Sequence, residues 1–430
     1  MTSGRSPVRL VGLLVAGLAW PAAGQEPVSS VGTDLSVYLI TMGPGQYVWE
    51  RYGHNALWVR DNRTGSGRAY NYGIFSFQQE NFFVRFVQGR PEYWMQGFEV
   101  QSHLQYYQEQ NRSLWVQELN LTPEQRVEIR DFLEWNELPE NRYYRYDPYL
   151  DNCSTRIRDL IDRVLGGRLR DLTDREETEA TFRHHSLRLV ADHIPTYVGL
   201  SLALGQPSDQ RLTAWEEMFI PLEMREYLRD ITVVGPDGRE EPLVLSERTL
   251  FESSASYGRE APPRWLVVFL GAGLLVAGLI VVPMLLAVRP AARVAATAAA
   301  VFWLLALGVA GVTMLGLWGF TNHWIAYRNE NLFFANPVAL VLAFTLPFAA
   351  RGGRGASRVS LWLAGVMVAL SLLGFMLQIL PWFDQVNGSI IALALPPNLA
   401  LGWVVWRLAT GAHRRASPTG STDDPPETAP

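Results

Sequence analysis

The stretch YLDNCSTRIRDLID, residues 149–162, is the part of the chain most able to do chemistry, because it holds the only cysteine among 430 residues. Asp151 or Asn152 can cap a helix whose apolar positions begin just after Cys153. The thiol would then lie in the first helical turn, where partial positive charge favours the thiolate. A buried structural cysteine is the plainer alternative. We interpret Cys153 as a nucleophile, because an unpaired thiol is a liability in an oxidising compartment.

A nucleophilic thiol needs a base. The first 264 residues contain five histidines, namely His54, His103, His184, His185 and His193. His54 is the best candidate, because RYGHNALWV places it behind a glycine turn at the start of a strand-like run. We expect His184 and His185 to be solvated on an arginine-bearing helix, and His193 to lie at a helix terminus. No metal site or cofactor is predicted, because the chain has no His-x-x-x-His pair and a single thiol.

The elements that must position these side chains change in type along the chain. The runs LSVYLITMG, NALWVRD and RAYNYGIFSF are typical of strands and are separated by GPGQ and NRTGSG turns. From Thr122 the pattern is helical, with a Thr cap and Pro123 at the first helical position. A second helix starts at Cys153 and stops at Gly166-Gly167. Strands followed by helices indicate an α+β domain over residues 25–264.

The second half of the chain is typical of a membrane domain, which we place at residues 265–410. Five apolar runs each approach the ~20 residues that cross a bilayer. They are Trp265–Val288, Val294–Trp318, Leu332–Ala350, Leu361–Leu380 and Ile390–Trp406. Residues 1–24 are predicted to be a cleaved signal peptide, with an uncleaved anchor as the alternative. Residues 411–430 are predicted to be a disordered tail, because they are rich in Pro, Ser, Thr and acidic residues.

Arginine placement predicts the orientation of these spans. Arginines follow the first, third and fifth runs, and positive loops stay in the cytoplasm. The domain of residues 25–264 would therefore lie outside and the C-terminus inside, in agreement with the signal peptide.

The net charge of −5 gives no indication of nucleic-acid binding. Between the second and third runs, residues 319–337 hold His323 and Arg328 among aromatics; these could bind a lipid phosphate, or form an ordinary interfacial loop.

The chain resembles the bacterial Lnb family. The resemblance is carried by RYGHNALWV, YNYGIFSF, YDPYLDNCSTRIRDLID, LGQPSDQRLTAWEEMFIP and YRNENLFFANP. It implies a periplasmic domain followed by an inner-membrane domain, and N-acylation of lipoproteins. The donor would be a phospholipid and the acceptor the free amine of a diacylglyceryl-cysteine lipoprotein. Asn152, His323 and Arg328 are candidate substrate-binding residues.

The motif order is also similar to circularly permuted papain-like enzymes of the NlpC and lecithin:retinol acyltransferase type. That resemblance implies a permuted papain-like fold, with His54 as base, Asn71 as the residue that orients it, and Cys153 as nucleophile. The acyltransferase relatives commonly have histidine where this chain has Asn71, which could instead be a strand-end asparagine bonded to the backbone. A cysteine hydrolase of peptidoglycan or lipid esters, and a non-enzymatic envelope assembly protein, remain as alternatives.

Overall fold

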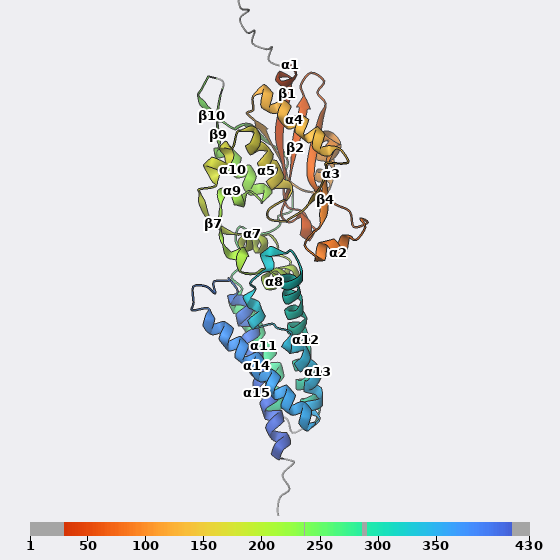
Figure 1. Ribbon diagram of the computed structural model, residues 1–430, viewed down its shortest axis with the longest axis vertical. Helices are drawn as coiled ribbons and strands as arrows, with labels where there is room; N and C mark the ends of the chain where they lie inside the picture. Colours follow the sequence, from red (N-terminus) through yellow and green to blue (C-terminus); the bar gives the residue numbers. More distant parts are fainter. Residues whose placement is uncertain (1–29, 236, 286–289, 415–430) are drawn as a thin grey trace, which may run out of the picture.

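The computed structural model describes residues 30–235, 237–285 and 290–414. The predicted signal peptide lies outside these residues, as does the tail beyond residue 414. The molecule is elongated: a sheet-rich domain stands on a bundle of long helices, and the first and last described helices, α1 (Ser30–Thr33) and α15 (Gly388–Arg414), lie at opposite ends of it (Figure 1). The predicted order, an α+β domain followed by five apolar helices, is confirmed.

A seven-stranded antiparallel sheet forms the centre of the first domain. In spatial order its strands are β11 (Val244–Phe251), β5 (Leu114–Leu119), β1 (Leu35–Met42), β2 (His54–Asp61), β3 (Gly67–Ile74), β4 (Glu92–Glu99) and β6 (Tyr143–Arg145). The three strand-like runs of the sequence are β1, β2 and β3. Because β1 is central and both its faces are covered, nearly all of its side chains are buried.

Helices cover both faces of this sheet. One face packs against α4 (Pro123–Glu137), α5 (Cys153–Val164) and α10 (Pro221–Asp230), and the other against α3 (Val100–Glu109). The Thr122 cap of α4 is confirmed, since its Oγ1 accepts a hydrogen bond from the Gln125 backbone N–H. The smaller elements are α1 (Ser30–Thr33), η1 (Val48–Glu50), α2 (Phe82–Val87), α6 (Arg168–Thr173), β7 (Glu177–Thr181), α7 (Phe182–Leu189), α8 (Ile194–Ala203), η2 (Gln206–Asp209), β8 (Arg211–Thr213), α9 (Ala214–Glu217), β9 (Thr232–Val234) and β10 (Glu240–Pro242).

Five long apolar helices make up the second domain. They are α11 (Leu266–Leu285), α12 (Pro290–Phe320), α13 (Val338–Ala350), α14 (Arg354–Leu377) and α15 (Gly388–Arg414). Small residues let them approach closely, and a Cβ at Gly273 of α11 would lie 2.6 Å from the Leu393 carbonyl oxygen of α15. α14 begins before the predicted Leu361, and α15 continues past Pro396-Pro397 and beyond the predicted end at residue 410.

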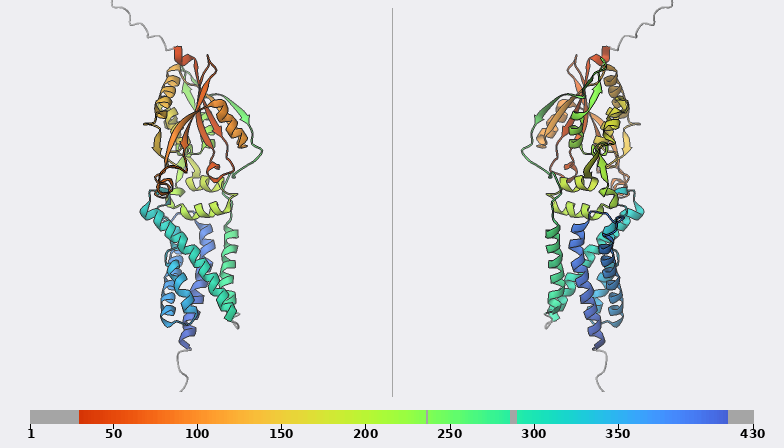
Figure 2. Two further views of the ribbon diagram at one scale, coloured as in Figure 1. Left: turned by 90° about the vertical axis from the view of Figure 1, so that its right-hand side faces the viewer. Right: turned by 90° about the vertical axis from the view of Figure 1, so that its left-hand side faces the viewer.

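The two domains are joined through the C-terminus of α8. Helix ends leave carbonyl groups without partners, and here the membrane domain supplies them. Asn329 Nδ2 donates to the Leu202 carbonyl at 2.7 Å, and Asn331 Nδ2 donates to the Ser201 carbonyl at 3.0 Å. Gln385 Nε2 donates to the Leu204 carbonyl at 3.1 Å. Figure 2 shows α7 and α8 lying crosswise between the sheet domain and the long helices.

Residues 319–337 are therefore an ordered connection. They form two short helices, η3 (Trp324–Ala326) and η4 (Glu330–Phe333). Trp324 Nε1 donates to Asp147 Oδ2 at 2.9 Å, and its ring packs edge-on against Tyr149. Both partners belong to the turn that precedes α5, so this loop of the membrane domain contacts the segment that carries Cys153.

Candidate active site

Asn152 caps the helix that carries the cysteine. Its Oδ1 accepts from the backbone N–H groups of Ser154 and Thr155 at 2.8 and 2.9 Å. Its Nδ2 donates to the carbonyls of Pro148 and Phe219, each at 2.9 Å. Of the two predicted caps, Asn152 is the observed one. Every hydrogen-bonding position of its side chain is used within the protein, so the structure favours a cap over the predicted substrate-binding role.

His54 and Asn71 lie on the same face of two neighbouring strands. Ala56 of β2 pairs with Asn71 of β3, so His54, two residues earlier on β2, is the diagonal neighbour of Asn71. The His54 Nε2 and Asn71 Oδ1 atoms are 3.0 Å apart, and Asn71 Nδ2 donates to the Ala69 carbonyl. Because Oδ1 can only accept, Nε2 carries the proton and Nδ1 of the neutral ring is left as the basic nitrogen.

Cys153 contacts β2 one residue after His54. The backbone N–H of Asn55, the residue after His54, interacts with the thiol. Gly73, which has a φ of +87°, is close to the cysteine, since a Cβ at this position would lie 3.8 Å from the Cys153 Cβ. The three predicted residues Cys153, His54 and Asn71 thus gather at one end of the sheet. Within the described residues, no hydrogen bond joins the imidazole to the thiol.

Both groups are neutral at rest. Burial, followed by the charge on Arg112, lowers the pKa of His54 from 6.5 to about 3. Burial raises the pKa of the Cys153 thiol, although the N–H groups of Asn55, Cys153 and Ser154 and the charge on Arg112 act in the opposite direction. The start of the helix does favour the thiolate, as expected, but burial of the sulfur outweighs this effect and leaves the pKa of the thiol raised.

Two further residues of the site, Tyr107 and Arg112, could not be recognised from any pattern in the sequence. The Tyr107 ring stacks on His54 with centroids 6.2 Å apart, and the guanidinium of Arg112 lies 4.8 Å from the centre of that tyrosine ring. Arg112 is buried and donates from Nε to the Gly43 carbonyl at 2.8 Å. Its Nη2 has no hydrogen-bond partner among the described residues. This buried cation acts on both the imidazole and the thiol.

The strand and the helix of the site are also held together by buried side chains. Asn55 Nδ2 donates to Ser154 Oγ at 3.1 Å, and Ser154 Oγ donates to the Met218 carbonyl at 2.6 Å. Asn55 and Ser154 are fully buried. Asn55 directly follows His54, and Ser154 directly follows Cys153. This adjacency is the only feature of the sequence that indicates a structural role for them at the site.

The other histidines do not join the site as bases. His103 is buried behind Tyr107, and burial lowers its pKa to about 4. His193 caps α8, as predicted for a helix-terminus histidine. The expectation of a solvated His185 is wrong: it is buried, and its Nε2 donates to Glu217 Oε1 at 2.6 Å. No group of three potential metal ligands occurs among the described residues.

His323 and Arg328 are not brought to Cys153. His323 Nε2 donates to the Phe86 carbonyl at 3.0 Å and so joins the membrane domain to α2. Arg328 is exposed, with a φ of +52°. The lipid-binding role predicted for these two residues remains a prediction.

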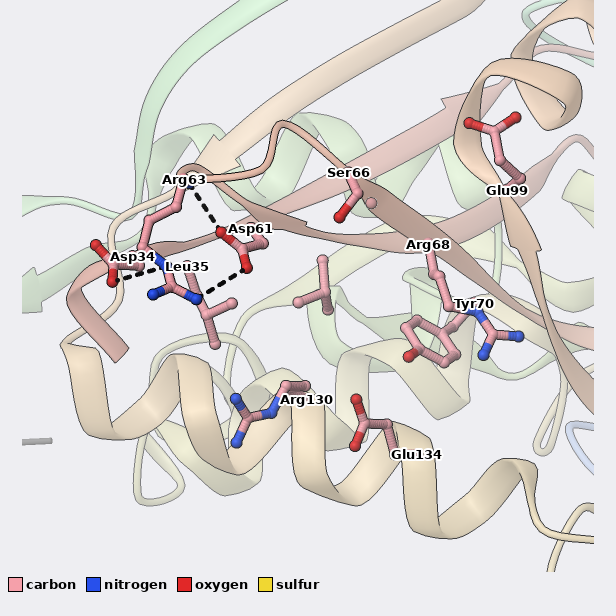
Figure 3. Close-up of a pocket in the computed structure, with 12 residues that line it drawn as sticks. Asp34, Leu35, Asp61, Arg63, Ser66, Arg68, Tyr70, Glu99, Arg130 and Glu134 are labelled. Carbon is pink, nitrogen blue, oxygen red and sulfur yellow. Dashed lines mark hydrogen bonds and ion pairs between the residues drawn. The ribbon is translucent and has the colours of Figure 1, made fainter. Parts of the chain in front are cut away.

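A charged cavity lies at the opposite end of the sheet. It measures about 670 Å³ and is lined by charged residues such as Asp34, Asp61 and Arg63 (Figure 3). β2 runs from His54 at the catalytic end to Asp61 at this cavity, roughly 23 Å away. The ion pair of Arg63 with Asp34 partly neutralises the cavity. Its position excludes it as the pocket of the thiol.

Comparison with known proteins agrees with this architecture. The model of the Lnb N-terminal periplasmic domain matches residues 29–191, which include Cys153, His54 and Asn71. The model of the Lnb transmembrane domain matches residues 268–396, within the five long helices. No curated protein and no solved structure matches the chain. The two models match in the order of the two observed domains, and the chain is therefore a multi-pass membrane protein that belongs to the Lnb family.

Proposed function

We propose that this protein is a lipoprotein N-acyltransferase that moves an acyl chain from a phospholipid, through a thioester on Cys153, to the N-terminal amine of a diacylglyceryl-cysteine lipoprotein. Membership of the Lnb family supports the reaction class. The observation that carries the mechanism is the imidazole of His54, fixed through Nε2 by Asn71 and placed beside a thiol at a helix start. This arrangement supports nucleophilic catalysis by the thiol, and the family supports acyl transfer as its outcome.

In the first half-reaction, His54 Nδ1 takes the thiol proton as Sγ attacks the ester carbonyl of the phospholipid. The carbonyl electrons move to oxygen and then return, and the bond to the glycerol oxygen breaks. The imidazolium gives its proton to that oxygen, so a lysophospholipid leaves. Because both groups are neutral at rest, proton transfer accompanies the attack. Asn71 keeps the ring oriented in both protonation states.

In the second half-reaction, the lipoprotein amine attacks the thioester. His54 takes a proton from the amine nitrogen, the C–S bond breaks, and the thiolate recovers that proton from the imidazolium. The product is an amide, which gives a triacylated lipoprotein. Backbone N–H groups at the start of α5 can hold the oxyanion formed in each half-reaction.

The topology proposed with this reaction puts the sheet domain in the periplasm and the C-terminus in the cytoplasm. His54 lies at the end of β2 that faces the membrane helices, since β2 begins opposite Met42 and ends beside the membrane-distal cavity. The thiol contacts the start of β2 and is therefore on the side of the sheet domain that faces the membrane helices, so both proposed substrates would reach it from the bilayer around those helices.

The decisive experiment gives purified protein a phospholipid with a labelled acyl chain and no acceptor. A ping-pong enzyme must then accumulate its covalent intermediate. We expect the label on Cys153, release by neutral hydroxylamine, and no label in Cys153→Ala. Addition of a diacylated lipopeptide should move the label to the peptide amine, as read by mass spectrometry. A label that resists hydroxylamine would contradict the thioester, and release as free fatty acid despite the lipopeptide would indicate a hydrolase.

A further inference from the structure

Two neighbouring segments of the sheet domain expose an unusual number of large apolar side chains. We call residues 47–49 and 77–87 the aromatic lip. Its exposed members are Tyr47, Trp49, Phe77, Phe83, Val84, Phe86 and Val87, each between 49 and 66 per cent exposed. Clustered apolar surface of this kind marks a site of interaction with a protein or a membrane.

The rings of the lip form one continuous surface. Tyr47 stacks on Trp49 with centroids 5.0 Å apart, and Trp49 meets Phe77 edge-on at 6.4 Å. Phe77 in turn stacks on Phe83 at 6.2 Å. The two segments, which lie before β2 and around α2, therefore act as a single patch.

The lip lies at the level of the outer ends of the membrane helices. The carbonyl of Gln88, directly after α2, accepts from the Asn322 N–H at 2.9 Å, and the Phe86 carbonyl accepts from His323. Asn322 comes just after α12, which ends at Phe320. Figure 1 shows α2 low on the sheet domain, beside the top of this bundle. Aromatic side chains are enriched at this depth, where hydrocarbon meets headgroups.

Basic side chains lie behind the lip. Arg85, Arg90 and Arg145 line a cavity of about 320 Å³ that contains one acidic residue, Glu92. Arg85 pairs with Glu92 at 2.5 Å, so two positive charges remain in the cavity. Apolar rings in front of arginines match a phospholipid, which presents acyl chains below a phosphate. This charge favours a bilayer over a protein partner.

A line of aromatic rings joins the lip to the thiol. Phe77 contacts Phe75 at 5.2 Å, Phe75 stacks on Tyr93 at 4.9 Å, and Tyr93 stacks on Tyr146 at 4.2 Å. A Gly73 side chain would begin 3.8 Å from both Tyr146 and Cys153, so these two residues are neighbours.

We propose that the aromatic lip inserts into the outer leaflet of the bilayer, and that an acyl chain reaches Cys153 along the rings of Phe77, Phe75, Tyr93 and Tyr146. Insertion of the lip is independent of the chemistry at the thiol. Passage of the acyl chain rests on the proposed function.

Insertion can be measured without catalysis. Cys153→Ala removes the only cysteine, and Phe83→Cys in that background gives one site for a nitroxide label. The matched control is Val234→Cys, because Val234 is 55 per cent exposed and lies on β9 at the membrane-distal end. In vesicles that contain phosphatidylglycerol, the label at position 83 should collide more with oxygen than with a polar nickel chelate, and the label at 234 should do the reverse. Water-like collisions at both positions would overturn insertion and leave a protein partner for the patch.

Entry of the acyl chain at the aromatic lip, where the proposed path begins, is tested by Phe83→Asp combined with Phe86→Asp, with Val234→Asp as the control. Labelling of Cys153 from phospholipid in vesicles should slow by roughly tenfold or more in the double variant and stay unchanged in the control. Normal labelling in the double variant would overturn the path. If position 83 is lipid-exposed and the wild-type protein gains no acyl label on Cys153, the proposed function is contradicted and insertion of the lip is supported. If position 83 is water-exposed and acylation of Cys153 is normal, insertion of the lip is contradicted and the proposed function is supported.

Discussion

His54 is the residue on which the proposed chemistry depends most. His54→Ala should slow acylation of Cys153 by roughly 100- to 10,000-fold, the usual range for a lost general base. Asn71→Ala should cost less, because Asn71 only holds the imidazole through Nε2. The measurement is the rate of label uptake from phospholipid at fixed pH. Normal uptake in His54→Ala would assign the base elsewhere, with the buried His103 as the next candidate.

The buried histidines also predict how stability depends on pH. The pKa values of His54 and His103 are lowered from 6.5 to about 3 and about 4 by burial. Between pH 6.5 and these values the unfolded chain binds more protons than the folded one, so stability falls as the pH falls. Thermal unfolding from pH 7 to pH 4 should show this loss, and His103→Gln should lose less than the wild type. Equal losses in both proteins would contradict a neutral buried His103.

For single residues, the sequence indicates which side chains are candidates for the site better than it indicates their protonation states. Cys153 and His54 could be predicted because a lone thiol at a helix start and a histidine after a glycine turn are local patterns. The pKa of the thiol could not be predicted, because it depends on atoms that tertiary packing brings around the sulfur. The roles of Tyr107 and Arg112 could not be predicted either, since only folding stacks Tyr107 on His54 and brings the charge of Arg112 close enough to act on the imidazole.

Among the elements, α5 depends on its cap. Asn152→Ala removes two hydrogen bonds to the helix start and two to the carbonyls of Pro148 and Phe219. We expect a loss of about 1–3 kcal/mol in the free energy of unfolding of the sheet domain. Denaturant unfolding followed by tryptophan fluorescence measures it. Full stability combined with lost acylation would instead support the substrate-binding role predicted from the sequence.

The turn before α5 depends on the membrane domain. Trp324→Phe keeps an aromatic side chain but removes the hydrogen bond to Asp147, which costs about 1 kcal/mol, together with part of the packing of the indole. We expect slower acylation of Cys153, because the turn that positions the thiol is less firmly held. Trp362→Phe is the control, since Trp362 is exposed on α14. Equal rates in the two variants would show that the contact does not position the thiol.

Element types were predictable from sequence because their signals are periodic and local. A β-rich run indicated β1, alternation of apolar and polar residues indicated β2, the run after the next turn indicated β3, and long apolar runs indicated α11–α15. The docking of the loop at residues 319–337 was not predictable. Its asparagines bind carbonyls at the end of α8, more than a hundred residues away, and no local pattern encodes that pairing.

For the whole molecule, the proposed topology has a direct test. A reporter fused after Pro430 should be active only in the cytoplasm, and one inserted at Gly238, in the exposed β9–β10 turn, only in the periplasm. The expectation follows from five spans and the distribution of arginines. Two reporters on the same side would show that one of the five helices does not cross the bilayer.

The hydrogen bonds from Asn329, Asn331 and Gln385 to the end of α8 hold the sheet domain on the membrane helices. A thiol held in this way keeps a fixed height above the lipid, and both proposed substrates diffuse within the same plane. Encounter is then a search in two dimensions. The rate should follow the mole fraction of donor in the membrane, and dilution of the vesicles at constant lipid composition should leave it unchanged.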